Sequence, residues 1–199
     1  MASLCNEALF KGAKAVAISL VAFLVAPTVA AGSRAEFSAE FLDKHPIAGN
    51  RLVDEVGILD VSDRRLIEER LYLLECWRGA QAAVVIVKTT RGEPIERFAW
   101  EVASKWRLGR VDVDDGLLFV IASEDRRFRI EVGRGLEAAL TDAWLDKMIV
   151  KYASDRLKAG DPAAAIIGVI SRVEKRISGL GKARCGVKNG RKVEPKSGS

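Results

Sequence analysis

The chain has 199 residues and a formal net charge of +5 at pH 7. Its one histidine, His45, lies next to Pro46 in a segment that reads as a linker, so neither a histidine-dependent catalytic triad nor a zinc-histidine site can be assembled in the core. The excess positive charge lies in residues 179–199, because residues 51–178 hold equal numbers of basic and acidic side chains.

The N-terminus has the pattern of a secretory signal. Lys11 and Lys14 precede an uncharged apolar run, Ala15–Ala26, and Pro27 and small residues follow. We therefore predict a signal peptide in residues 1–31 and a periplasmic or extracellular location. The alternative is an uncleaved N-terminal anchor, which would tether the domain to the membrane.

The remainder divides into three parts. Residues 32–50 show no sustained period and are predicted to be a linker, residues 51–178 a single domain, and residues 179–199 a basic disordered tail. Such a tail can also contact anionic lipid through nonspecific charge attraction. Specific nucleic-acid binding is not expected outside the cytoplasm.

The first half of the domain alternates helix and strand patterns. After a briefly alternating segment, Ser62 is expected to cap a helix that ends at Gly79. The apolar, β-branched run Gln81–Lys88 predicts a buried strand. A second helix is expected from Pro94 to about Leu108.

The second half begins with two strands. Residues 117–122 are apolar on both faces and predict a central strand, and residues 127–132 alternate. Only four residues join them, too few for a parallel crossover, so they must form an antiparallel hairpin. A third helix is expected over Thr141–Ala159, and a fourth begins at Asp161 and Pro162. This order predicts an α/β fold with a mixed sheet between helices.

Cysteine use is compatible with export but assigns no bond. Cys5 leaves with the signal if the signal is cleaved, which leaves Cys76 and Cys185. We expect Cys76 to be a small packed residue and Cys185 an accessible thiol, and the sequence does not show whether the two meet.

Five carboxylates lie in loops beside the predicted elements and are candidate metal ligands: Asp54, Asp114, Asp115, Glu137 and Asp142. If these loops converge on one rim of the sheet, the like charges need a cation or an arginine between them. Oxygen ligands favour a hard ion, so calcium or magnesium is the expected cofactor. The alternative is that each carboxylate caps a helix or stabilises a turn.

The chain resembles the TPM domain family over about residues 50–178. The resemblance rests on ordered motifs across the domain: VDEVGIL at 53–59, GAQAAVVIV at 79–87, KWRLG at 105–109, DDGLLFVIA at 114–122 and RFRIEVGRGLEAALTD at 127–142.

This resemblance implies a three-layer α/β/α sandwich with Rossmann-like layering. It also implies divalent-cation binding near the five carboxylates in some members, and phosphatase activity has been attributed to a plant member. The chain departs from the usual pattern at Asp115, Arg134 and Ala138, where asparagine, tyrosine and glycine are common.

Two functions are therefore expected. The first is an exported module that binds a divalent cation and contacts envelope or membrane proteins. The alternative is a metal-assisted acid phosphatase acting on phosphate monoesters. In that enzyme Asp114 or Asp115 holds the ion and Arg127, Arg129 or Arg134 receives the phosphate.

Overall fold

The computed structural model describes residues 51–180. The predicted signal peptide, linker and residues 181–199 of the tail lie outside this range. Among the residues described, no helix combines the length and apolar character needed to cross a membrane.

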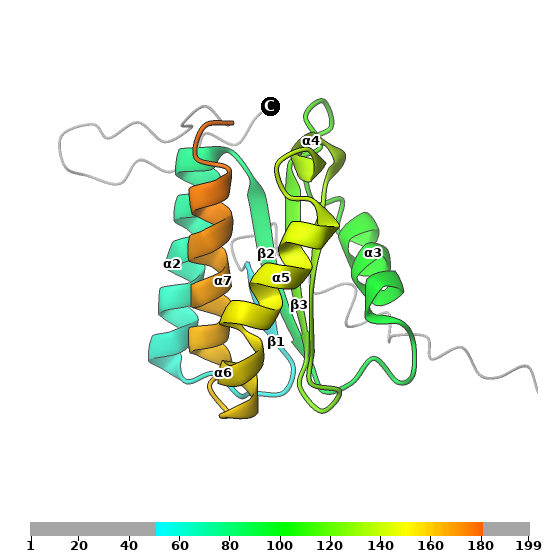
Figure 1. Ribbon diagram of the computed structural model, residues 1–199, viewed down its shortest axis with the longest axis vertical. Coiled ribbons are helices and arrows are strands. Elements are labelled where there is room, and N and C mark those ends of the chain that lie inside the picture. Colours follow the sequence, from blue (N-terminus) through cyan, green and yellow to red (C-terminus); the bar gives the residue numbers. More distant parts are fainter. Residues whose placement is uncertain (1–50, 181–199) are drawn as a thin grey trace, which may run out of the picture. The chain divides into compact units, whose positions relative to one another are not determined.

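A mixed sheet of four strands forms the centre of the domain (Figure 1). The strands lie in chain order: β1 (Leu52–Asp54), β2 (Gln81–Val87), β3 (Gly116–Ala122) and β4 (Arg127–Val132). β1, β2 and β3 are parallel, and β4 pairs antiparallel to β3, which confirms the predicted hairpin. The three-residue β1 was not predicted as a strand.

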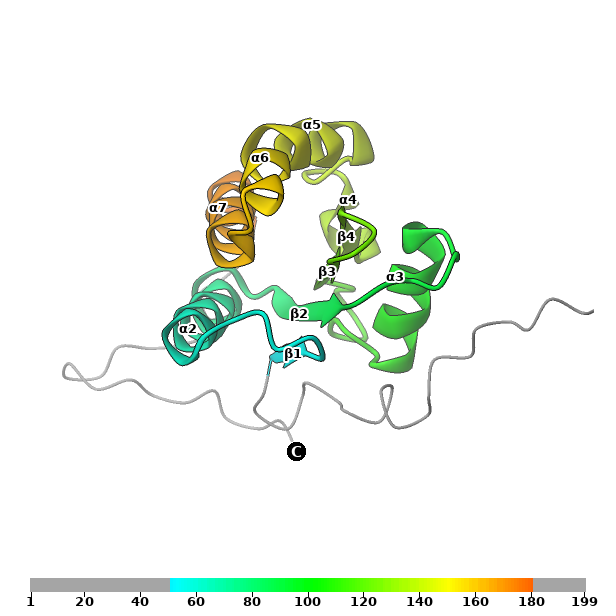
Figure 2. The same ribbon diagram turned by 90° about the horizontal axis from the view of Figure 1, so that it is seen from below.

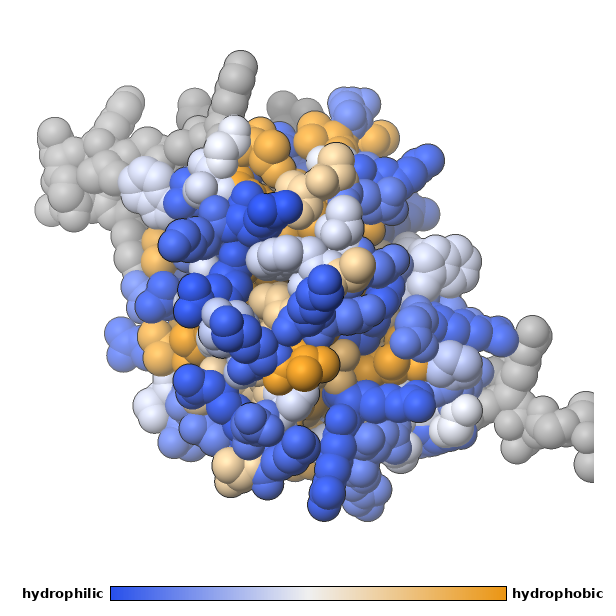
Figure 3. Space-filling model, in the orientation of Figure 1, coloured by the Kyte–Doolittle hydropathy of each residue, from blue (hydrophilic) through white to orange (hydrophobic). Residues whose placement is uncertain are grey.

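In the described part of the chain, six helices accompany the sheet: α2 (Val61–Arg78), α3 (Ile95–Lys105), α4 (Arg134–Glu137), α5 (Asp142–Tyr152), α6 (Ser154–Lys158) and α7 (Pro162–Arg176). α2, α5, α6 and α7 lie on one side of the sheet and α3 on the other (Figure 2). The predicted α/β/α layering is confirmed. Hydrophilic residues predominate on the outer surface of the larger helical layer, which faces the reader in Figure 3.

Two apolar cores hold these layers together because successive strand residues point to opposite faces of the sheet. Phe119 and Ile130 pack with α2, α5 and α7 on one face. Leu118 and Val120 pack on the other face with Phe98 of α3, and Trp106 closes this second core. Burial on both faces explains the continuous apolar sequence of β3.

The cap of α2 differs from the prediction. Asp60, not Ser62, is the N-cap, and its carboxylate accepts a hydrogen bond from the backbone N–H of Asp63 at 2.8 Å. Ser62 donates its hydroxyl to Asp60 Oδ1 at 2.6 Å. These two hydrogen bonds lower the pKa of Asp60, the Ser62 hydroxyl contributing most. The negative charge of Asp60 also interacts favourably with the positive end of the helix dipole.

Two helix boundaries were also wrong. The helix predicted to run to about Leu108 ends at Lys105. The helix predicted over Thr141–Ala159 is interrupted at Ala153, so that α5 and α6 are separate. Gly160 closes α6 as expected, with a φ of +75°.

Cys76 is buried, with 2% of its surface exposed, as predicted. It is also disulfide-bonded, which the sequence did not establish.

Candidate functional site

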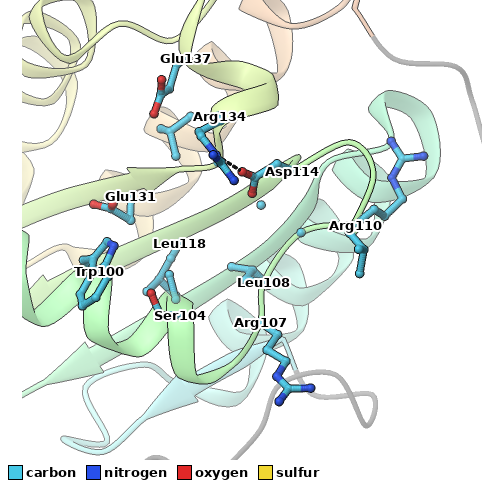
Figure 4. A pocket seen from close by; sticks show the side chains of 16 residues that line it. Trp100, Ser104, Arg107, Leu108, Arg110, Asp114, Leu118, Glu131, Arg134 and Glu137 are labelled. Atoms are coloured by element: carbon cyan, nitrogen blue, oxygen red, sulfur yellow. Dashed lines mark hydrogen bonds and ion pairs between the residues drawn. The ribbon is translucent and has the colours of Figure 1, made fainter.

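A pocket of about 600 Å³ lies at the end of the sheet where β3 begins and β4 ends. Its walls are the C-terminal half of α3, the loop of residues 106–115, the end of β4 and α4; we call it the α3–α4 pocket. Figure 4 shows Asp114 and Arg134 at its centre, Glu137 to one side, and Trp100 and Glu131 at the far wall.

The loop of residues 106–115 owes its shape to Asp115. This carboxylate is 4% exposed and accepts hydrogen bonds from the backbone N–H of Arg110 at 2.9 Å and from Arg110 Nε at 2.7 Å. A second guanidinium nitrogen of Arg110 also donates to it. Hydrogen bonding to Asp115 raises the pKa of Arg110. Because its oxygens are used within the loop, Asp115 is a structural residue rather than a free ligand.

Two features of the backbone place Asp114 at the pocket: its own strained conformation and the close packing of α4 against its loop. Its φ is +52°, a conformation that residues other than glycine rarely adopt. Its carbonyl accepts a hydrogen bond from Gly135 N at 2.9 Å. A Cβ at Gly135 would lie 1.9 Å from the carbonyl oxygen of Val113, and one at Gly133 would lie 2.2 Å from that of Asp114. The two glycines of the VGRG sequence therefore let α4 rest against the loop.

Asp114 and Arg134 form an ion pair in the pocket. Arg134 Nε lies 2.8 Å from Asp114 Oδ2, and the hydrogen bond raises the pKa of Arg134. Arg134 is 87% exposed and Asp114 39% exposed, so solvent reaches both groups. Glu137 lines the same pocket one helical turn from Arg134. Of the five predicted ligands, the structure brings Asp114 and Glu137 to this pocket.

Glu131 is a pocket carboxylate that the sequence analysis missed. Burial raises the pKa of Glu131 above its ordinary 4.5, and Asp142 and Glu137 add to the shift. Arg129 opposes it and lies 3.7 Å from Glu131 and 3.1 Å from Asp142. Asp142 is therefore paired with Arg129 at the start of α5. The alternating pattern of residues 127–132 could have identified Glu131, because it places the charged side chains of β4 together on the side of the sheet that α3 covers.

Asp54 lies at the opposite end of the sheet from Asp114. It pairs with Ile86, which is opposite Ile121 near the end of β3, whereas Asp114 precedes the first residue of β3. At about 3.3 Å per residue, roughly 17 Å of strand separates the two levels.

Asp54 is also fully engaged where it lies. Its side chain is buried and accepts from the backbone N–H groups of Gly57 at 2.8 Å and Leu59 at 3.1 Å. Arg64 donates to it at 3.1 Å. Asp54 therefore shapes the VDEVGIL loop after β1.

The three predicted phosphate-binding arginines do not share a cleft. Arg134 lines the α3–α4 pocket, Arg129 joins β4 to α5, and Arg127 is exposed at the start of β4. The pocket contains two arginines that were not predicted, Arg107 and Arg110. Both come from the WRLGR sequence, and in Figure 4 their side chains point away from Asp114.

The carboxylates do not form a preorganised cation site. Within residues 51–180, no group of three histidine, cysteine or acidic side chains is placed to hold a metal ion. Asp54 and Asp115 use their oxygens in loop hydrogen bonds, and Arg134 already neutralises Asp114. Calcium needs six to eight oxygen ligands, so these residues as arranged do not fit it.

Sheet order, layering and pocket together define an α/β/α sandwich domain with a charged pocket at one end. The chain belongs to the TPM domain family, whose model matches residues 52–176. Among curated proteins, none is significantly similar to this chain.

Solved structures support the same assignment. The N-terminal domain of a protein from P. gingivalis is 27% identical, with a TM-score of 0.59, covering 64% of this chain and 82% of that one. An N-terminal domain from Corynebacterium glutamicum is 18% identical (TM-score 0.53; 69% of this chain, 84% of that one). A protein from the psychrophilic bacterium Bizionia argentinensis is 17% identical (TM-score 0.57; 65% and 88%). The last two show the fold alone.

Proposed function

We propose that this chain is an exported protein-interaction module that binds an envelope partner at the α3–α4 pocket. One observation carries the proposal: Trp100, at the wall of the pocket, is 60% exposed. An exposed tryptophan beside charged groups is typical of interaction surfaces, where tryptophan and arginine contribute much of the binding energy.

The surroundings of Trp100 support this role. Val111 also lines the pocket and is 99% exposed. Because burial of an apolar side chain is favourable, a partner that covered Val111 would gain binding energy from it. Arg107 lies on the same wall with its side chain exposed. The pocket thus offers apolar surface beside a guanidinium, a combination suited to a mixed polar and apolar segment of a partner protein.

Two features support export. The signal pattern of residues 1–31 is one, and the disulfide at Cys76 is the other, because disulfides persist mainly in oxidising compartments. Cell fractionation followed by N-terminal sequencing tests location and cleavage together. Recovery of the chain in the cytoplasm with reduced Cys76 would reject this part of the proposal.

Site-specific photocrosslinking tests the pocket. A photoreactive phenylalanine derivative is placed at position 100, and in a matched control at position 77, because Trp77 on α2 is 42% exposed and does not line the pocket. We expect one envelope protein to crosslink from position 100 and not from position 77. Trp100→Ala should then weaken binding of that purified protein about 30-fold. Equal crosslinking from both positions would reject the pocket as the binding surface.

The alternative acid phosphatase has one supporting observation, the presence of Asp114, Arg107 and Arg134 in a single pocket. In a metal-assisted enzyme, Asp114 would have to break its ion pair with Arg134 and bind the metal ion instead. Hydrolysis of an aryl phosphate by the purified chain, lost in Asp114→Ala and retained in Asp112→Ala, would favour this function. Absence of hydrolysis with magnesium, calcium or manganese would reject it.

A further inference from the structure

A second cavity, of about 620 Å³, is lined by residues of α5 and α7. Both helices face the reader in Figure 1. We call this cavity the α5–α7 groove. Its walls carry five cationic side chains and no acidic one: Lys147, Lys151, Arg172, Lys175 and Arg176. The spacing of these residues along each helix, three or four apart, places them on one face.

The positive charge of the groove is not neutralised within the domain. No carboxylate of residues 51–180 lies within ion-pair distance of any of the five cations. Two of the three acidic residues of these helices are paired elsewhere: Asp142 with Arg129 of β4, and Glu174, at 3.8 Å, with Arg78 of α2. Asp146 is exposed on α5 but does not line the groove. The cationic side chains of α5 and α7 therefore line the groove, and the acidic side chains of these helices lie outside it.

Aromatic rings hold the cations in position. The guanidinium carbon of Arg172 lies 4.4 Å from the centroid of the Tyr152 ring, and Lys151 Nζ lies 5.4 Å from the same centroid. Arg176 lies 5.6 Å from the centroid of Trp144 and donates Nε to the carbonyl of Ala139 at 3.0 Å. Packing against rings restricts these long side chains, so less conformational entropy is lost when they bind an anion.

The same geometry discriminates between anionic ligands. Stacking of nucleobases needs free aromatic faces, and cations cover Tyr152 and Trp144. Anchoring in a bilayer needs protruding apolar side chains, whereas the rings of Tyr152 and Trp144 are partly buried and lie beneath cationic side chains. A concave groove with arginines on its rim suits carboxylates carried on a chain, because guanidinium groups bind carboxylates through two parallel hydrogen bonds.

We propose that the α5–α7 groove binds an acidic segment of a partner protein, with Lys151 and Arg172 on opposite helices contacting its carboxylates. This surface is separate from the α3–α4 pocket, since the two share no lining residue. The domain then has two binding surfaces, one recognising a mixed segment and the other an acidic one.

Fluorescence anisotropy tests the groove with the full chain. The probe is a labelled peptide of about twelve residues rich in glutamate and aspartate, and its counterpart carries glutamine and asparagine instead. We expect saturable binding of the acidic peptide that weakens with added salt, and none of the neutral one. The double variant Lys151→Gln/Arg172→Gln should weaken binding about tenfold. The control Arg65→Gln/Lys105→Gln removes two exposed cations from α2 and α3 and should change it less than about twofold.

Thermal melting of each variant establishes that it is folded. Deletion of residues 181–199 is a further arm, because that segment is also basic. The proposal is overturned if the acidic peptide does not bind, if the groove variant binds as the full chain does, or if deletion alone abolishes binding. Sedimentation with vesicles containing phosphatidylglycerol that depends on Lys151 and Arg172, without peptide binding, would assign the groove to lipid instead.

Discussion

Arg134 Nε lies 2.8 Å from Asp114 Oδ2, at the centre of the pocket where the family resemblance implies a divalent cation. The guanidinium provides the positive charge that the carboxylate requires. A tyrosine, which is common at this position in the family, would leave Asp114 and Glu137 without it. The cation expected from the sequence remains a prediction, and Arg134 is the residue that opposes it.

Replacing Arg134 should therefore strengthen calcium binding. We expect calorimetry to show that Arg134→Tyr binds calcium about tenfold more tightly than the native chain, because a repelling charge is lost and a carboxylate is freed. Arg107→Ala is the control, since Arg107 lines the same pocket and pairs with no carboxylate of the described residues. Equal calcium affinity in all three proteins would show that Arg134 does not govern the site.

Asp54 is predicted to be a stability residue rather than a ligand. Asp54→Asn should lower the free energy of unfolding by about 2 kcal/mol, because the amide presents N–H groups to the donors of Leu59 and Arg64. Urea denaturation measures the change. Asp112→Asn, an exposed carboxylate in the loop of residues 106–115, should alter it by less than about 0.5 kcal/mol. A loss as large in Asp112→Asn would contradict this interpretation.

The contact between α4 and the loop of residues 106–115 leaves no room for a methyl group. Gly135→Ala should destabilise the domain by about 1–3 kcal/mol, because the added carbon would meet the Val113 carbonyl at 1.9 Å. Gly168→Ala in α7 is the matched control. Its nearest neighbour would be the Tyr152 carbonyl at 3.8 Å, and alanine favours a helix interior, so a gain of up to about 1 kcal/mol is expected. Denaturation that ranks the two variants in the reverse order would refute the close approach.

Asp125 predicts a pH-dependent contribution to stability. Its carboxylate accepts from Thr90 N and from the Thr89 hydroxyl, both at 2.8 Å. The Thr90 N–H is the main cause that lowers the pKa of Asp125 below its ordinary 3.8. Because the folded-state pKa is lowered, this contribution is present above pH 3.8 and is lost as the pH falls through the folded-state value.

The measurement compares thermal melting of the native chain and Asp125→Asn. We expect the difference in Tm to be largest at about pH 6 and to disappear as the pH approaches about 2. Asp146→Asn, which removes an exposed carboxylate of α5, is the matched control. A constant difference for Asp125→Asn would mean that its charge does not act in this way.

The fold could be predicted from the sequence because its signals are local. The continuous apolar residues 117–122 indicated a central strand, and four linking residues required the hairpin with residues 127–132; both were confirmed. The stripe of Ile95, Phe98, Val102 and Trp106 is buried as its helical spacing indicated. The break at Ala153 was missed because alanine carries no signal for ending a helix.

The candidate site was predicted less well because it depends on partners distant in sequence. Asp54 is the last residue of the parallel strand β1, whereas Asp114 precedes the parallel strand β3, so they lie at opposite ends of the sheet. Whether a carboxylate is free depends on its donors. The pairing of Asp142 with Arg129 arises only when α5 packs beside β4.

The two edge strands of the sheet restrict how this domain can bind other proteins. β1 has three residues, and β4 carries Arg127, Arg129 and Glu131 along one side while α5 contacts it. Edge strands that are short or carry charged side chains disfavour the addition of a strand from another chain to the sheet. A partner of this domain is therefore expected to dock through side chains on its helical surfaces, and the domain is protected from the strand-by-strand stacking that leads to aggregates.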